Sequence, residues 1–157
     1  MLYVDTSVLV KLYIKEEYSL EVSHWIKRNN EAIPLTRFHE LEFTNAIYLK
    51  QFRTEMTNEQ ALLVLSKFDE HQGRGVYYRP QINWTDTINF ALDLSQNHTK
   101  ATGSRSLDIL HVASALAIKA NRFLTLDKRQ SAMAGSAGLT VDNCVFGVSP
   151  TVFTGWA

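Results

Sequence analysis

Two aspartates directly follow short apolar runs and precede helical patterns. Asp5 ends the run LYVD, and Asp127 ends the run RFLTLD. The carboxyl ends of parallel strands meet at one edge of a sheet, where α/β proteins form their sites. A carboxylate at the inner end of a buried strand is costly unless a cation or hydrogen-bond donors compensate it. Both positions therefore predict a shared polar site at this edge.

Two further acids interrupt otherwise apolar helical patterns. Glu42 lies in FHELEFTNAI, and Asp108 lies in SLDILHVASA. Four carboxylates brought together would repel one another unless cations lie between them. Hard divalent cations prefer carboxylate oxygen, and magnesium usually keeps waters that a substrate phosphate can replace. The four acids therefore predict a site for a hard divalent cation such as Mg²⁺.

The chemistry that such a site supports is phosphodiester hydrolysis. A bound divalent ion lowers the pKa of its water, and a second ion about 3.5–4 Å away could stabilise the leaving oxygen. This chemistry needs no protein nucleophile, and the sequence contains no persuasive nucleophile motif. The residues alone leave open whether one or two ions take part.

Each acid also has a simpler interpretation. Asp5 and Asp127 could cap the helices that follow them, and Asp108 could stabilise the first turn of its own helix. Glu42 could be a solvated helix residue, and Glu40 is an equal candidate by composition. The joint arrangement favours a site, because independent caps would not explain two strand-end aspartates together with two acids in apolar helices.

Polar neighbours of the acids are candidates for supporting roles. His111 lies one turn after Asp108, either as a packing residue or as a group that accepts a proton or touches a metal. Hydroxyl groups that could cap a helix or bind a carboxylate belong to Thr6, Ser7 and Thr125. Cations that could contact phosphate, or simply lie on the solvated surface, are Arg105, Lys128 and Arg129.

The elements that must position these residues alternate between strand and helix patterns. Strands are expected at 2–5, 32–36, 122–127 and 139–142, and the stretch 73–80 contains a brief β-like run that Pro80 closes. Helices are expected at 7–14, 18–30, 38–52, 61–71, 85–98, 106–121 and 128–138, with a polar loop at 99–105. Such alternation is typical of an α/β fold with a central, mainly parallel sheet flanked by helices.

Composition limits the other possibilities for these 157 residues. Lys+Arg and Asp+Glu are balanced at 16 each, so binding to nucleic acid would need a local basic patch. The single cysteine, Cys144, excludes an internal disulfide and a cysteine-rich zinc site. No apolar run reaches membrane-spanning length and no signal peptide is visible, so we expect a cytoplasmic protein without a membrane partner.

Three blocks of the sequence resemble the PIN-domain family, and within it the VapC-like toxin ribonucleases. They are VDTSVLVKLY, ELEFTNAI and GSRSLDILHVASALAIKANRFLTLDKRQSAMAGSAGLTV. The resemblance places metal-binding acids on Asp5, Asp108 and Asp127. It selects Glu42 over Glu40, because an alanine and a hydrophobic residue follow Glu42 as in the family. It covers about residues 1–142 of a single PIN-like domain, 1–157, with 143–157 as an extension of unassigned role.

The resemblance implies a three-layer fold, Mg²⁺ or Mn²⁺ as cofactor, and RNA as substrate. For the toxin subgroup it also implies a homodimer and an antitoxin partner. Two alternatives remain: an inactive PIN-like module that binds RNA or protein, and a housekeeping nuclease that is not a toxin. A haloacid-dehalogenase-type enzyme is disfavoured, because it needs a second aspartate where Ser7 stands.

Overall fold

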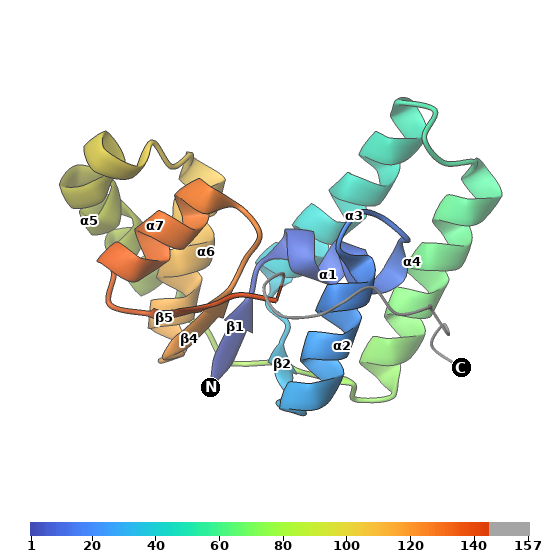
Figure 1. Ribbon diagram of the computed structural model, residues 1–157, viewed down its shortest axis with the longest axis horizontal. Helices are drawn as coiled ribbons and strands as arrows, with labels where there is room; N and C mark the ends of the chain where they lie inside the picture. The colour runs from blue at the N-terminus through green and yellow to red at the C-terminus, as the bar shows by residue number, and fades with distance from the viewer. Residues whose placement is uncertain (145–157) are drawn as a thin grey trace.

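The computed structural model describes residues 1–144 and alternates strands with helices (Figure 1). The strands are β1 (Leu2–Val4), β2 (Ile33–Pro34), β3 (Tyr77–Tyr78), β4 (Arg122–Leu124) and β5 (Thr140–Asp142). The helices are α1 (Thr6–Tyr13), α2 (Ser19–Asn29), α3 (Arg37–Phe52), α4 (Asn58–Gly73), α5 (Trp84–Thr102), α6 (Ser106–Ala117) and α7 (Lys128–Ser136). This is the α/β class that the alternating patterns predict.

The strands pair in parallel, as expected. One sheet has the order β1-β4-β5, and a second, two-stranded sheet pairs β2 with β3. Val4 lies opposite Leu124, and the amide of the next residue, Asp5, donates to the Leu124 carbonyl at 3.1 Å. The chain continues from β4 through Thr125 to Asp127. Both strand-end aspartates therefore leave the sheet at its carboxyl edge.

Helices cover the sheet on two sides. In Figure 1, α5, α6 and α7 lie on one side of the strands, and α1 to α4 lie on the other. Alternate residues of a strand face opposite sides. Accordingly, Leu2 and Val4 join the core under α1 to α4, whereas Tyr3 joins the core under α5 to α7. Strand β1 thus contributes to two hydrophobic layers at once, which explains why its three residues are all buried and apolar or aromatic.

Helix α3 is fixed to β1 by a buried histidine. The Thr36 amide donates to His39 Nδ1 at 3.1 Å, and the His39 amide donates to the Thr36 hydroxyl at 3.3 Å. This is a capping box in which histidine takes the place of the usual glutamate or glutamine. The opposite ring nitrogen, Nε2, donates to the Val4 carbonyl at 2.8 Å. The contact sets the start of α3 beside the residue that precedes Asp5.

Some boundaries differ from the sequence-based prediction. The expected loop at 99–105 is wrong in its first half, because α5 continues to Thr102 and ends where Gly103 adopts a left-handed φ of 65°. The short strand expected at 32–36 is reduced to Ile33–Pro34, whereas the brief β-like run expected within 73–80 is Tyr77–Tyr78. The predicted extension at 143–157 lies outside the described residues, apart from Asn143 and Cys144. Within residues 1–144, no helix is long and apolar enough to cross a membrane.

Protonation of His39 should limit stability in acid. Burial, together with the charge of nearby His111, lowers the pKa of His39 to about 3, although its bond to the Val4 carbonyl opposes the shift. The unfolded chain takes up this proton near pH 6.5, whereas the folded chain does not until about pH 3. This contribution to the free energy of unfolding is therefore complete above pH 6.5 and falls as the pH drops toward 3.

The test compares urea unfolding of the wild type and His39→Gln across this range. The wild type should lose roughly 1 kcal/mol per pH unit through His39 alone as the pH falls from 6.5. The variant should be less stable at neutral pH but should show a shallower pH slope, because it lacks this titrating group. If the free energy of unfolding depended equally on pH in the two proteins, His39 would not be the buried neutral group responsible for this loss of stability.

Candidate functional site

A cavity of about 510 Å³ opens at the carboxyl edge of the sheet. All four acids that the sequence singles out line it: Asp5 after β1, Glu42 on α3, Asp108 on α6, and Asp127 after β4. The other lining residues that carry polar side chains are Thr6, Ser7, Asn45, His111 and Gln130. Acids from four separate segments of the chain thus reach one hollow of the surface.

Asp5 is the most deeply buried of the four acids. It is 3% exposed, and burial raises the pKa of its carboxyl, although its hydrogen-bond donors and the charge of His111 oppose the shift. Oδ1 accepts from the Val8 amide and the Ser7 hydroxyl, both at 2.8 Å. Oδ2 accepts from the Thr125 hydroxyl at 2.7 Å. The helix-cap interpretation is therefore correct for Asp5, and the same carboxylate also faces the cavity.

Glu42, and not Glu40, faces the cavity from α3. Its Oε2 accepts from the Thr6 hydroxyl at 2.8 Å and pairs with His111 Nε2 at 2.5 Å. Burial acts to raise the pKa of Glu42, but the bond and charge of His111 outweigh burial and lower this pKa. Glu40 instead forms ion pairs with Arg37 and Arg79. The choice between the two glutamates that composition left open is thereby made by the geometry of α3.

Asp108 and Asp127 each use one oxygen to hold the start of a helix. Asp108 Oδ2 accepts from the Arg105 amide at 2.9 Å, and Asp127 Oδ1 accepts from the Arg129 and Gln130 amides at 2.7 and 3.0 Å. The second carboxylate oxygen of each residue has no hydrogen bond within residues 1–144. These acids are therefore oriented by backbone donors, and each has one oxygen without a hydrogen-bond partner in the described residues.

The supporting residues divide into two groups. Thr6 and Ser7 line the cavity and bind acids there, and Thr125 binds Asp5 from behind it. The three candidate cations are exposed and lie outside the cavity lining, namely Arg105, Lys128 and Arg129. Because the backbone amides of Arg105 and Arg129 bind the acids, both side chains start close to the edge of the cavity.

Asn45 and Gln130 also line the cavity, although the sequence analysis did not single them out. Asn45 lies three residues after Glu42, and Gln130 lies three residues after Asp127. Residues three apart on a helix lie on the same face. A search for polar residues one turn beyond each acid would therefore have found both of them.

The donor set fits a hard divalent ion, but only in an open arrangement. Within residues 1–144, no three histidine, cysteine, aspartate or glutamate side chains come together closely enough to hold a metal ion. Magnesium usually takes one or two protein carboxylates and completes its shell with water and substrate oxygens. The carboxylate oxygens left without protein partners on Glu42, Asp108 and Asp127 suit such a shell.

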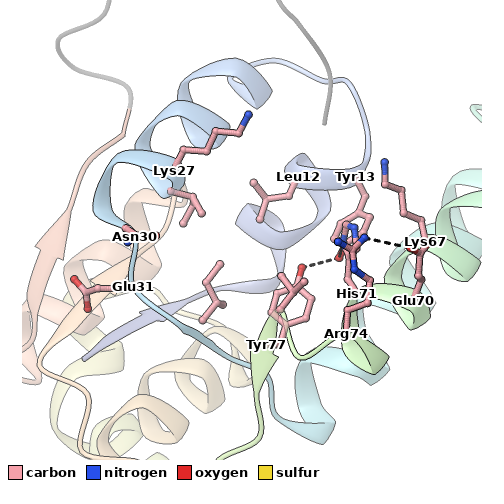
Figure 2. Close-up of a pocket in the computed structure, with 13 residues that line it drawn as sticks. Leu12, Tyr13, Lys27, Asn30, Glu31, Lys67, Glu70, His71, Arg74 and Tyr77 are labelled. Carbon is pink, nitrogen blue, oxygen red and sulfur yellow. Dashed lines mark hydrogen bonds and ion pairs between the residues drawn. The ribbon is translucent and has the colours of Figure 1, made fainter. Parts of the chain in front are cut away.

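A second cavity, of about 670 Å³, lies between α1, α2 and α4 (Figure 2). Figure 2 shows the Tyr13 hydroxyl between His71 and Tyr77, with hydrogen bonds of 2.8 and 2.7 Å. The two carboxylates in its lining are already paired, Glu70 with Arg74 and Glu31 with Arg122. Although this cavity is larger, both of its carboxylates are paired with arginines, so it is a weaker candidate for metal-dependent chemistry than the cavity that holds the four acids.

Comparisons with known structures identify the fold. FitAcB from Neisseria gonorrhoeae matches with a TM-score of 0.65 and 15% identity, over 93% of this chain and 99% of that chain. PAE2754 from Pyrobaculum aerophilum matches with a TM-score of 0.51 and 16% identity, over 89% and 87%. No family model matches the sequence, and no curated protein does. At these identities the likeness concerns the fold, which is PIN-like with a parallel sheet.

Asparagine at position 5 should preserve the fold. The amide oxygen of Asp5→Asn can still accept from the Val8 amide, so we expect the free energy of unfolding to change by no more than about 1 kcal/mol. Asp5→Val leaves the Ser7 and Thr125 hydroxyls and the Val8 amide without their acceptor, and should cost about 1–3 kcal/mol more. Equal stabilities of the two variants in urea unfolding would contradict this account of the Asp5 contacts.

Proposed function

We propose that this chain is a metal-dependent endoribonuclease and the toxin of a toxin–antitoxin pair. One observation carries the proposal: four carboxylates from separate segments line one cavity at the carboxyl edge of a parallel sheet. The PIN-like fold and the sequence blocks that resemble VapC-like ribonucleases support it. The chemistry of the site, rather than the fold alone, favours a nuclease, because one fold can serve many functions.

Mg²⁺ or Mn²⁺ is the proposed cofactor, with Asp5, Glu42, Asp108 and Asp127 as the residues that hold it. When bound, such an ion lowers the pKa of its water and offsets the charge of the substrate phosphate. The chain's own contribution is orientation. Thr6 fixes one oxygen of Glu42, and backbone amides fix one oxygen each of Asp108 and Asp127, so the second oxygen of these three acids is held without reorganisation. Both oxygens of Asp5 accept hydrogen bonds, from the Val8 amide and the Ser7 and Thr125 hydroxyls, which fix its carboxylate at the cavity.

RNA is the proposed substrate, and the cations near the cavity are its proposed phosphate contacts. Arg105, Lys128 and Arg129 are exposed and start beside Asp108 and Asp127. The chain carries equal numbers of basic and acidic residues, 16 each, so nonspecific attraction along the whole surface is weak. Binding would then depend on this local group of cations and on the shape of the cavity.

Apolar side chains beside the acids support protein partners in the same proposal. Leu41 on α3 is 67% exposed and Leu107 on α6 is 54% exposed, and both line the cavity that holds the acids. An antitoxin could cover these leucines and place an arginine among the carboxylates, which a guanidinium binds in a bidentate manner. Exposed Phe52 and Leu63 on α3 and α4 offer apolar surface for the proposed homodimer.

The nuclease proposal predicts RNA cleavage that requires Mg²⁺ or Mn²⁺ and stops when excess chelator is added. Glu42→Gln should lower the cleavage rate by at least about 100-fold, because it removes a charge from the site. Glu40→Gln is the matched control on the same helix, and it should cleave at the wild-type rate because Glu40 lies outside the cavity lining. Full activity in chelator, or equal losses in the two variants, would reject the metal mechanism.

The toxin proposal predicts that expressing the chain alone in the cytoplasm of bacteria arrests their growth. Asp127→Asn keeps the oxygen that caps α7 but loses the charge, so it should fold and be harmless. The antitoxin of such a pair is expected from the adjacent gene, and co-expression of that gene should restore growth of cells that express the wild type. Normal growth of cells that contain soluble, folded wild-type chain would contradict a toxin, and the cleavage assay would then separate a housekeeping nuclease from an inactive binding module.

A further inference from the structure

His111 is a buried histidine that uses both ring nitrogens. It lies on α6, one turn after Asp108, and is 3% exposed. Nε2 lies 2.5 Å from Glu42 Oε2, and Nδ1 lies 3.0 Å from the Tyr3 hydroxyl. These contacts connect β1, α6 and α3 through three side chains that are far apart in the sequence.

The direction of the hydrogen bonds follows from the chemistry of the groups. A carboxylate can only accept, so the proton between His111 and Glu42 belongs to Nε2. In the neutral imidazole, Nδ1 then has a lone pair and accepts from the Tyr3 hydroxyl. The Thr6 hydroxyl donates to the same oxygen, Glu42 Oε2, at 2.8 Å. Oε2 therefore has two side-chain donors, whereas Oε1 has no hydrogen-bond partner within residues 1–144.

Packing holds this chain of contacts in place. Tyr3 is fully buried and stacks on Phe123, with ring centroids 5.4 Å apart and planes 13° from parallel. On the other side of the imidazole, the Phe38 ring lies 4.6 Å from the His111 ring. Because the Tyr3 and His111 rings cannot turn without displacing the core residues packed against them, the fold fixes the position of the Nε2 proton relative to Glu42.

We propose that His111 is a positioning residue that, together with Tyr3, holds Glu42 Oε2 and so presents Oε1 as the single metal-binding oxygen of this glutamate. The inference rests on the proposed metal-dependent function. A glutamate on an exposed helix would sample several rotamers, and the ion would have to select one of them. Here the bond from His111 selects the rotamer of Glu42 before the ion binds. His111 is in turn bonded to Tyr3 on β1, the strand that Asp5 directly follows.

Affinity for Mn²⁺ in the absence of RNA tests this role without relying on cleavage. Calorimetric titration should show that His111→Ala binds Mn²⁺ about 10–100-fold more weakly than the wild type, as for other residues that orient metal ligands. His111→Gln should recover part of the affinity, because its amide N–H can donate to Glu42. Tyr3→Phe removes only the hydroxyl and should show a smaller loss.

His71→Gln is the control, since the His71 ring also shares a hydrogen bond with a tyrosine hydroxyl, that of Tyr13, but lines the second cavity and not the one that holds the acids. It should lower the free energy of unfolding and leave the affinity for Mn²⁺ unchanged. A His111→Ala or His111→Gln variant that is folded and binds Mn²⁺ as tightly as the wild type would overturn the positioning role. Equal losses of affinity in His71→Gln and His111→Gln would overturn it too, because general destabilisation would explain both.

Nitrogen-15 NMR of the imidazole rings separates this inference from the proposed function. The metal-free protein should show His111 with the proton on Nε2, and Tyr3→Phe should shift the Nδ1 resonance. A ring that carries its proton on Nδ1 and none on Nε2 would overturn the inference whatever the protein does with metal, because Nε2 could then not donate to Glu42. The expected tautomer in a wild-type protein that neither binds Mn²⁺ nor cleaves RNA would reject the proposed function and, with it, the assignment of Oε1 as a metal ligand.

Discussion

The burial of one carboxylate at the end of a parallel strand is the constraint on which the site depends. Asp5 can stay there only because the Val8 amide and the Ser7 and Thr125 hydroxyls donate to it. Thr125 directly follows β4, the strand paired with β1, so this compensation exists only when β1 and β4 are in register. The same register brings Asp127 to this edge. Fold and site are therefore not independent features of the chain.

Capping and ligand binding are compatible roles for the same acid. Asp108 and Asp127 each accept hydrogen bonds from the backbone on one carboxylate oxygen, which leaves the second oxygen without a partner within residues 1–144. Backbone amides thus orient these two carboxylates, so that no additional side chains are needed to do so. This explains how a site that has few supporting residues close in sequence can still hold its carboxylates in defined directions.

Much of the architecture could be predicted from the sequence, because apolar runs followed by helical spacing specify parallel α/β units. The same pattern put Asp5 and Asp127 at the ends of strands, and Asp108 stood out as an acid in an apolar helical pattern. Glu42 and Glu40 were equal candidates by composition, and only the resemblance to the PIN-domain family selected Glu42. Contacts between distant segments could not be predicted: no local pattern shows that Thr125 reaches Asp5, or that Tyr3 orders Glu42 through His111. The end of α5 was also missed, since the polar residues before Gly103 have no apolar period although they remain helical.

The central claim is that the four acids form one metal site, and a crystal structure of the Mn²⁺-soaked protein tests it most directly. Anomalous scattering locates manganese without assumptions about its ligands. The account predicts a peak in the cavity at the carboxyl edge, beside Glu42 Oε1 and the open oxygens of Asp108 and Asp127, and its loss in Glu42→Gln. A well-ordered cavity with no anomalous peak, or manganese bound only elsewhere in a crystal of active protein, would contradict the account.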